Sequence, residues 1–294
     1  MTDLALLVEA GGAAWEEADA FAAHEWWEAA WLRQPDGPLR EGLRALTQWA
    51  AAAHLDVLGR CEAALTIRAR ARQRFRRTEN RLALAPFALD LPSDEHDNLV
   101  LRDKNDAFAV TAVLLAAGHG RRAGGPKALI AVDGQPLWQR QVQRLRLVGL
   151  TRAIAVLPPS ARLAAAPPLR ICHGDPDGTP LHSLQRALAL TPGPVLLLPV
   201  DCPAPARGVV VRLLAAGVRD PKLLAVRPIV ATPTGPRGGH PLWLAAATCQ
   251  QLLALDANAQ RLDRFLHTLG AAYGSVAVAD SAVLGNFNQD GVAR

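Results

Sequence analysis

The 294-residue sequence has no long apolar run and no pair of cysteines at metal-binding spacing. Its apolar stretches, such as residues 110–117 and 195–200, have the length of strands, whereas a membrane helix needs roughly 20 apolar residues. The N-terminus opens acidic and lacks a positively charged start followed by an apolar stretch, so we expect no export signal and a cytoplasmic protein. The four cysteines stand far apart in the chain: Cys61, Cys172, Cys202 and Cys249. We predict reduced thiols that are mostly buried.

Glutamate is absent from residues 106–294, which contain only ten aspartates. The first 105 residues carry 13 basic and 17 acidic side chains, whereas the remainder carries 19 and 10, so the basic excess lies in the second part. This excess either reflects a general use of arginine or suits a polyanionic small substrate. No basic cluster there is interleaved with aromatic residues, which argues against a nucleic-acid partner.

The length and the apolar content predict two domains. Residues 1–88 are rich in Ala, Leu, Glu and Arg, with apolar residues at three- and four-residue spacing, and predict a helical bundle. We expect one helix from Trp15 to Trp31, a second over residues 43–57 and a third over residues 60–81. Residues 89–106 predict a linker, because Pro, Asp, Ser and Asn replace the helical pattern.

Residues 107–294 alternate short apolar strands with turns and amphipathic helices, which predicts an α/β sheet with helical crossovers. The expected strands cover residues 109–116, 153–157, 169–172, 195–199, 223–228 and 274–278.

A glycine-rich loop follows the first of these strands and ends at Lys127. Its glycines would let backbone N–H groups approach phosphate oxygens, and its cations would neutralise a triphosphate. The loop matches neither common phosphate-binding template, since Ala128 follows the lysine where the P-loop needs Ser or Thr. The glycines and cations concerned are Gly118, Gly120, Arg121, Arg122, Gly124, Gly125 and Lys127.

The run L-A-A-G-H-G-R-R-A-G-G-P-K at residues 115–127 closely resembles the nucleotidyltransferase superfamily that activates sugar phosphates, methylerythritol phosphate and molybdenum cofactor, the last most strongly. Four later segments are similar to the family in the same order. They are Gly178 with Ser183-Leu184, the strand ending at Asp201, Gly239-His240-Pro241, and Asn286-x-Asn288.

This resemblance implies a Rossmann-like three-layer αβα fold for residues 107–294 and an Mg²⁺ cofactor. It implies that Lys127 and Arg121 or Arg122 contact the triphosphate, and that His240 helps to shape the acceptor side. The implied nucleotide-binding residues are Leu115, Ala116, Ala117, Gly118, Gly120, Arg122, Gly124 and Ser183.

Asp201 is the best-placed metal ligand, because it follows an apolar strand in a domain without glutamate. Asn288 stands where part of the family has a second acidic ligand, and an amide does not neutralise a cation, so the second ligand stays open. We expect Asp263 to be a helix-surface residue and not a base.

The implied reaction transfers CMP or GMP from a nucleoside triphosphate to the phosphate of molybdopterin cofactor and releases pyrophosphate, an activity of EC 2.7.7 type. Leu-Ala-Ala-Gly at residues 115–118 favours CTP, whereas Asn286-x-Asn288 is more similar to the guanylyl branch, and we expect CMP in preference to GMP. A molybdoenzyme or chaperone partner is also implied. Two alternatives are a sugar or alcohol phosphate as the acceptor, and a catalytically reduced nucleotide-binding module.

The helical part contains the run H-E-W-W-E-A-A-W at residues 24–31, which resembles domain of unknown function 309. His24 and Glu28 share a helix face, and His54 is expected on the next helix. These three residues either converge on a metal or ligand or form a buried hydrogen-bonded trio, and we favour the trio.

Overall fold

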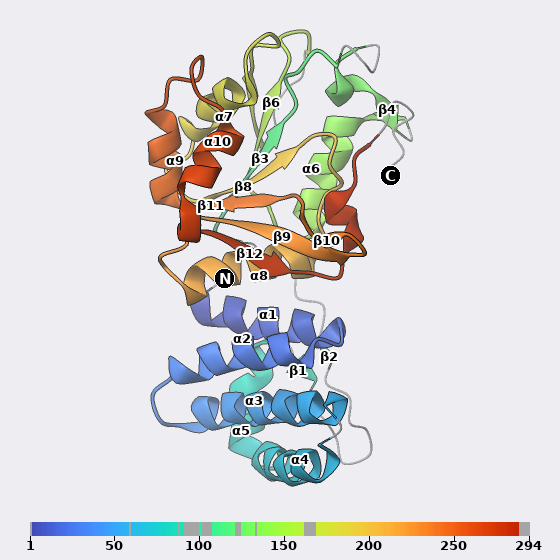
Figure 1. Ribbon diagram of the computed structural model, residues 1–294, viewed down its shortest axis with the longest axis vertical. Coiled ribbons are helices and arrows are strands. Elements are labelled where there is room, and N and C mark those ends of the chain that lie inside the picture. The colour runs from blue at the N-terminus through green and yellow to red at the C-terminus, as the bar shows by residue number, and fades with distance from the viewer. Residues whose placement is uncertain are drawn as a thin grey trace. The chain divides into compact units, whose positions relative to one another are not determined.

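The computed structural model describes residues 2–58, 60–87, 89–90, 100–101, 108–120, 125–132, 134–161 and 169–287. The chain divides into two compact units, Met1–Lys104 and Asn105–Arg294 (Figure 1). The domain limits drawn from the sequence, 1–88 and 107–294 with a linker between them, stay a prediction. Within these described ranges, no helix is both long and apolar enough to cross a membrane.

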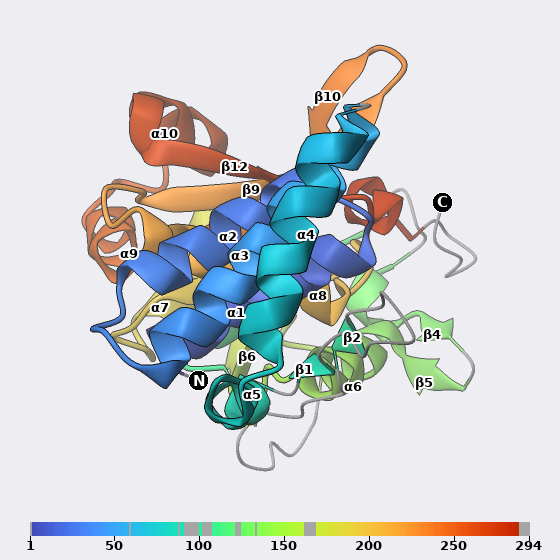
Figure 2. The ribbon, with the colours of Figure 1, turned by 90° about the horizontal axis from the view of Figure 1, so that it is seen from below.

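The first unit is a helical bundle in which α2 packs between α1 and α3, and α3 also packs against α4 and α5. Figure 2 shows α2, α3 and α4 along their lengths. Its helices are α1 (Asp3–Glu16), α2 (Ala20–Leu32), α3 (Pro38–Val57), α4 (Cys61–Phe75), α5 (Thr78–Leu84) and the 3₁₀ turn η1 (Ala85–Phe87). Two short antiparallel strands, β1 (Leu89–Asp90) and β2 (Val100–Leu101), lie in the range that the sequence predicts as a linker.

The single helix predicted from Trp15 to Trp31 is wrong, because the chain turns between α1 and α2. Ala18 has a positive φ of 58°, which ends α1, and the Asp19 carboxylate then accepts from the Ala22 N–H at 2.9 Å and starts α2. The turn brings the Trp15 and Trp27 rings together, with centroids 6.1 Å apart.

The helix predicted over residues 60–81 is also divided, into α4 and α5. The Asn80 amide donates to the Arg74 carbonyl at 2.9 Å, and the Arg81 guanidinium donates to the Phe75 carbonyl at 2.8 Å. These side chains satisfy the last carbonyls of α4, so the helix ends there without loss of hydrogen bonding.

The second unit contains a mostly parallel sheet with the strand order β10-β9-β11-β8-β3-β6-β7, and β12 pairs with β9. Four neighbouring strands of it are parallel, namely β3 (Thr111–Leu115), β6 (Ala153–Leu157), β7 (Leu169–His173) and β8 (Val195–Pro199), and β12 is parallel to β9. The remaining strands of this sheet are β9 (Ala225–Thr232), β10 (Gly235–Gly238), β11 (Leu242–Leu244) and β12 (Tyr273–Ala277). Strand β11 runs antiparallel to both β8 and β9. A separate antiparallel pair consists of β4 (Ala131–Val132) and β5 (Gln135–Pro136).

Helices cover both faces of this sheet, so the predicted three-layer αβα arrangement is confirmed (Figure 1). The helices are α6 (Leu137–Leu147), α7 (Pro180–Leu188), α8 (Arg207–Arg219), α9 (Ala246–Leu253) and α10 (Leu262–Thr268). On one face, apolar residues of α7, α9 and α10 pack on Val113, Ile154 and Leu197 of the sheet. Helices α6 and α8 lie on the other side in both views (Figures 1 and 2).

The order of the parallel strands creates a switch point between β3 and β8. After β3 the chain adds β6 and β7 on one side and then returns to place β8 on the other. Ligands of open α/β sheets bind at the carboxyl ends of the strands at such a point. The sequence segments expected to carry the chemistry follow these two strands.

Candidate active site

The glycine-rich loop leaves β3 and closes on itself through its own backbone. Gly120 has a φ of 58°, and a Cβ there would lie 1.9 Å from the Gly125 carbonyl oxygen. The Gly125 N–H donates to the Gly120 carbonyl at 3.3 Å. Only glycine fits this close approach, which turns the chain back toward the end of β3. Arg121, Arg122 and Gly124, which the sequence assigns to the nucleotide, lie outside the described residues.

Lys127 and Asp201 meet at the switch point of the sheet. Lys127 begins the 3₁₀ turn η3 (Lys127–Leu129), and Asp201 follows the end of β8. The lysine Nζ donates to the Asp201 Oδ2 at 2.7 Å, and the two side chains are 33% and 29% exposed. Residues 74 positions apart in the sequence therefore share one partly buried ion pair that still reaches the solvent.

The C-terminal segment reaches the same place. The Phe287 N–H donates to the Asp201 carbonyl oxygen at 2.6 Å, and the Cys202 thiol donates to the Asn286 Oδ1 at 3.4 Å. Burial, together with the nearby Asp201 carboxylate, raises the pKa of the Cys202 thiol to about 12, so Cys202 is a neutral donor. Asn288 lies outside the described residues, and its role as a metal ligand stays a prediction.

A cavity of about 380 Å³ opens between the loop, the end of β8 and the N-terminus of α7. It gathers every described residue that the sequence assigns to the nucleotide and the metal. It is lined by Leu115, Ala116, Ala117, Gly118, Gly120, Lys127, Asp175, Gly178, Pro180, Ser183, Pro199, Val200 and Asp201. Backbone N–H groups, a helix N-terminus and a lysine in one concave site suit a bound phosphate chain.

Asp175 lines this cavity and Gly174 packs against two of its lining residues, although nothing in the sequence marks either of them. A Cβ on Gly174 would lie 2.4 Å from the Ala117 Cβ and 3.0 Å from the Ser183 Oγ. At the rim, the His119 Nε2 and the Asp177 Oδ1 lie 3.0 Å apart and join the β3 loop to the turn before α7. The turn after β7 thus adjoins the start of the glycine-rich loop.

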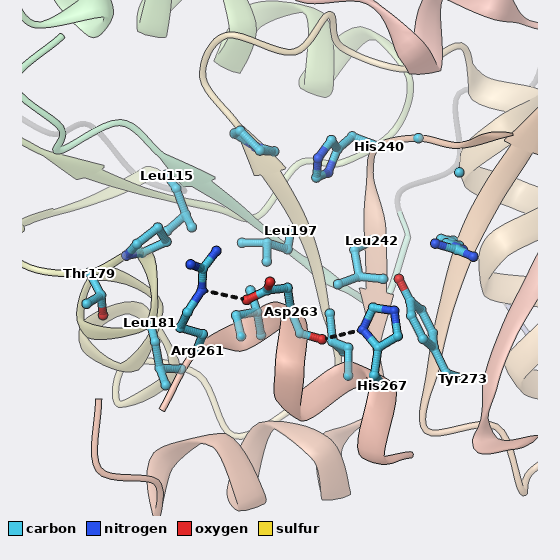
Figure 3. Close-up of a pocket in the computed structure, with 17 residues that line it drawn as sticks. Leu115, Thr179, Leu181, Leu197, His240, Leu242, Arg261, Asp263, His267 and Tyr273 are labelled. Atoms are coloured by element: carbon cyan, nitrogen blue, oxygen red, sulfur yellow. Dashed lines mark hydrogen bonds and ion pairs between the residues drawn. The ribbon is translucent and has the colours of Figure 1, made fainter. Parts of the chain in front are cut away.

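A larger cavity of about 740 Å³ adjoins the first and shares Leu115, Pro180 and Pro199 with it (Figure 3). Leu197 and Leu242 of the sheet contribute apolar lining. The polar lining includes Thr179, Arg227, His240, Arg261, Asp263, His267 and Tyr273. Among the described lining residues Asp263 is the only acid against two arginines, so this cavity suits an anionic molecule.

The polar groups of the larger cavity hold one another in place. The Arg261 Nε donates to the Asp263 Oδ1 at 3.0 Å, and the His267 Nδ1 donates to the Asp263 carbonyl oxygen at 2.7 Å (Figure 3). The Arg227 guanidinium lies 5.1 Å from the Tyr273 ring centroid. Asp263 is on the first turn of α10 and 60% exposed, in line with the expectation of a helix-surface residue.

His240 stands in the wall of the larger cavity, on the side of Asp201. Its N–H donates to the Val283 carbonyl at 2.8 Å, and a Cβ on the preceding Gly239 would lie 2.3 Å from the same oxygen. Burial lowers the pKa of His240, and the Asp201 carboxylate opposes part of this shift. The imidazole is therefore neutral at pH 7, and its buried Nδ1 has no partner among the described groups.

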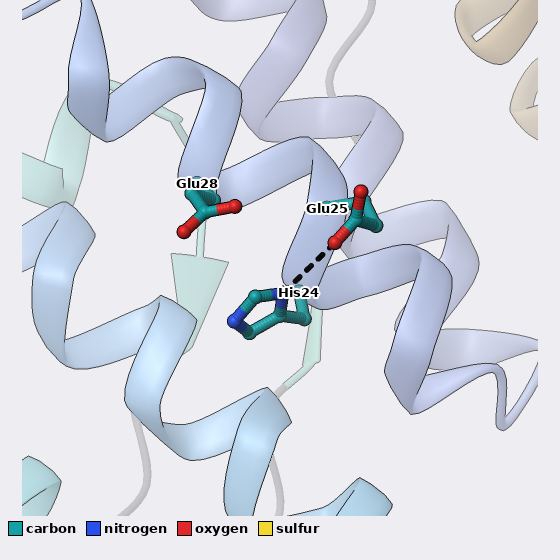
Figure 4. A group of neighbouring side chains, drawn as sticks. All are labelled: His24, Glu25 and Glu28. Atoms are coloured by element: carbon teal, nitrogen blue, oxygen red, sulfur yellow. Dashed lines mark hydrogen bonds and ion pairs between the residues drawn. The ribbon is translucent and has the colours of Figure 1, made fainter.

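In the helical unit, the structure groups His24 with Glu25 and Glu28 (Figure 4). The predicted hydrogen-bonded trio with His54 is not formed among the described residues. Instead, the His54 ring packs against Phe21, with centroids 5.2 Å apart. Glu25 joins the group in its stead, because its Oε1 lies 3.3 Å from the His24 Nδ1.

Two family models match this chain. The model described as MobA-like NTP transferase domain matches residues 112–273, which contain the sheet and both cavities, and the model for domain of unknown function 309 matches residues 8–67. The chain belongs to the family of MobA-like NTP transferase domains. It thus carries a nucleotidyltransferase domain, as its loop and strand-end aspartate predict.

One curated relative matches part of this MobA-like domain. A probable molybdenum cofactor guanylyltransferase from Opitutus terrae is 33% identical over 103 residues, which are 34% of this chain and 51% of that relative. The chain thus spans about half the length of the curated relative it matches.

Solved structures of similar fold include the Rv0371c homologue from Mycobacterium sp. strain JC1, with a TM-score of 0.48 and 23% identity over 58% of this chain and 86% of that one. Another is the 2-C-methyl-D-erythritol 4-phosphate cytidylyltransferase from Thermus thermophilus, with a TM-score of 0.46 and 20% identity over 60% and 91%.

Proposed function

We propose that this protein transfers a nucleotidyl group from a nucleoside triphosphate to the phosphate of a small acceptor, with release of pyrophosphate. The observation that carries the proposal is the Lys127–Asp201 pair, 2.7 Å apart at the switch point of the sheet and in the wall of a backbone-lined cavity. A lysine for phosphate and a carboxylate for a metal ion are the two charges that this transfer needs.

In this proposal, the two adjoining cavities bind different substrates. The smaller one, with the loop backbone, Ser183 and the start of α7, takes the triphosphate. The larger one, with Arg227 and Arg261, takes the anionic acceptor. Their shared wall at Leu115, Pro180 and Pro199 would bring the acceptor phosphate next to the α-phosphate of the nucleotide.

The residues present fit a magnesium ion. Mg²⁺ is usually held by one or two carboxylates together with substrate phosphates, and Asp201 is a partly exposed carboxylate at the mouth of the phosphate cavity. When bound, the ion would neutralise charge on the triphosphate. Lys127 is placed to exchange its hydrogen bond with Asp201 for one with a phosphate oxygen.

The transfer requires no protein nucleophile. An oxygen of the acceptor phosphate forms a bond to the α-phosphorus, and the bond from the α-phosphorus to the bridging oxygen of the β-phosphate breaks as pyrophosphate leaves. The acceptor phosphate is already ionised at neutral pH, so no side chain has to remove a proton. The neutral His240 serves as a hydrogen-bonding group for the acceptor.

We infer that CTP is preferred to GTP and that molybdopterin cofactor is the acceptor. Ala117 lines the nucleotide cavity with its methyl group next to Gly174, and this methyl group leaves less room for a purine than glycine would. The name of the Opitutus terrae relative supports the molybdenum-cofactor acceptor but favours GTP. A sugar or alcohol phosphate is the alternative acceptor, and a molybdoenzyme or chaperone that receives the product stays a prediction.

The test is pyrophosphate release by the full chain with CTP or GTP and Mg²⁺, each with and without molybdopterin cofactor. We expect release only with both Mg²⁺ and the acceptor, faster with CTP, and none in Asp201→Asn. If neither triphosphate binds in the presence of Mg²⁺, the proposal is wrong. Binding without release, with molybdopterin cofactor or with sugar and alcohol phosphates, would identify a catalytically reduced module.

A further inference from the structure

A group of metal-ligating side chains lies in the helical unit, separate from the nucleotidyltransferase domain. His24, Glu25 and Glu28 of α2 each offer one ligand atom, and these three atoms lie within 4.8 Å of one another (Figure 4). The His24 Nδ1 and the Glu25 Oε1 are 3.3 Å apart. The side chains of His24 and Glu25 are 26% and 40% exposed, so the group is partly buried and still open to solvent.

The two carboxylates of this group lack a cationic partner. In the part of the chain that the structure describes, Glu25 pairs only with the His24 imidazole, and Glu28 forms no ion pair. The nearby arginines are engaged elsewhere, since Arg40 pairs with Asp36 and Arg44 with Glu41. Two adjacent, partly buried negative charges repel each other, and a bound cation would remove this repulsion.

A buried donor follows the group on the same helix. His54 of α3 packs on Phe21, one helical turn before Glu25, and its ring is not part of the group. Trp31 follows Glu28 by one turn, and its buried Nε1 has no acceptor among the described residues. An indole N–H at this position can donate to the outer oxygen of a metal-bound carboxylate.

We propose that His24, Glu25 and Glu28 bind one divalent transition-metal ion, with Trp31 as an outer hydrogen-bond donor. A set of imidazole and carboxylate ligands favours Zn²⁺ and similar ions over Mg²⁺, which prefers oxygen ligands alone. The site is independent of the Mg²⁺ expected at Asp201.

The experiment measures Zn²⁺ binding to the chelator-treated full chain by calorimetry and by metal analysis after dialysis. The Asp201→Asn background removes the metal ligand of the nucleotidyltransferase domain, so only the helical unit can give a specific signal. We expect one Zn²⁺ per chain, with at least about 100-fold weaker binding in His24→Gln and Glu28→Gln. Trp31→Phe, which removes only an outer donor, is expected to weaken binding about 10-fold.

Glu62→Gln is the matched control, because it removes one exposed carboxylate of the same unit that lies on α4. Its Zn²⁺ affinity is expected to equal that of the background. Melting curves without metal check that each variant is folded, and added Zn²⁺ should raise the melting temperature only where the site is intact. Absence of saturable Zn²⁺ binding to the background protein would overturn the proposal. So would a Zn²⁺ affinity of folded His24→Gln or Glu28→Gln equal to that of the background.

Discussion

Replacement of Lys127 by methionine tests the proposed active site most directly. Methionine keeps the length and the apolar stem of the side chain but removes the ammonium group that lies 2.7 Å from the Asp201 Oδ2. If this ammonium group stabilises charge on the triphosphate in the transition state, the substitution must lower turnover. If Lys127 only pairs with Asp201, turnover stays and stability changes.

The effect of Lys127→Met on folding stability is expected to be much smaller than its effect on turnover. Both side chains are about one-third exposed, so the ion pair contributes about 1 kcal/mol or less to folding. Removal of one preorganised donor to transition-state charge costs roughly 3–4 kcal/mol in other enzymes. At about 1.4 kcal/mol for each factor of ten, this corresponds to a loss of turnover of roughly 100- to 1,000-fold.

The assay is steady-state pyrophosphate release, combined with thermal unfolding of the same samples. Lys222→Met is the matched control, because Lys222 is an exposed lysine in the turn after α8 that lines neither cavity. We expect full activity in this control and a nearly unchanged melting temperature in both variants. Turnover within about threefold of the unchanged protein in folded Lys127→Met would refute the role of Lys127.

Three further predictions concern the glycine-rich loop, the choice of nucleotide base, and His240. Gly120→Ala should weaken triphosphate binding at least about 10-fold in calorimetry and lower stability by about 1–3 kcal/mol, since its φ is 58° and its Cβ would meet the Gly125 carbonyl. Ala117→Gly should raise kcat/KM for GTP relative to CTP, because the methyl group against Gly174 is removed. His240→Asn should flatten the loss of stability in mild acid, measured by melting curves between about pH 7 and 5. The lowered pKa of His240 means that only the unfolded chain takes up this proton as the pH falls through about 6.5, which destabilises the fold.

Each of these predictions has a contrary result. Normal triphosphate affinity in Gly120→Ala would show that triphosphate binding does not need the close approach of Gly120 and Gly125. An unchanged CTP to GTP ratio in Ala117→Gly would place base selection elsewhere in the cavity. Parallel pH profiles for His240→Asn and the unchanged protein would mean that His240 is protonated in the folded state.

Features with a local signal in the sequence could be predicted. The six expected strands each overlap a strand of the sheet. The signal is clearest for β3, β6 and β8, because these buried strands are continuous apolar runs bounded by turn residues. The loop, Asp201 and Ser183 could be found because each lies within a few residues of a strand end or a helix start. The three-layer fold follows from the same alternation of strands and helices.

Features that depend on contacts between distant segments could not be predicted. Strand β11 has three residues and follows a Gly-rich hairpin, so it lacks the length that marks a strand. The break between α1 and α2 depends on Ala18 and Asp19, which the helical spacing of the tryptophans on either side conceals. Gly174 is noticeable only because Ala117 and Ser183 approach it in space.

The same distinction separates the reaction from its substrate. The groups proposed for the transfer, Lys127 and Asp201, each lie in a segment that directly follows one strand. A short sequence motif can therefore identify each of them. The cavity proposed for the acceptor is lined by Arg227 of β9, Tyr273 of β12, and Arg261 and His267 at α10, which no short motif links. Substitutions in this wall can therefore change the acceptor without disturbing Lys127 and Asp201. If the two cavities have these separate roles, substitution of Arg227 should change which acceptor is used. It should leave kcat unchanged for any acceptor that the variant still accepts.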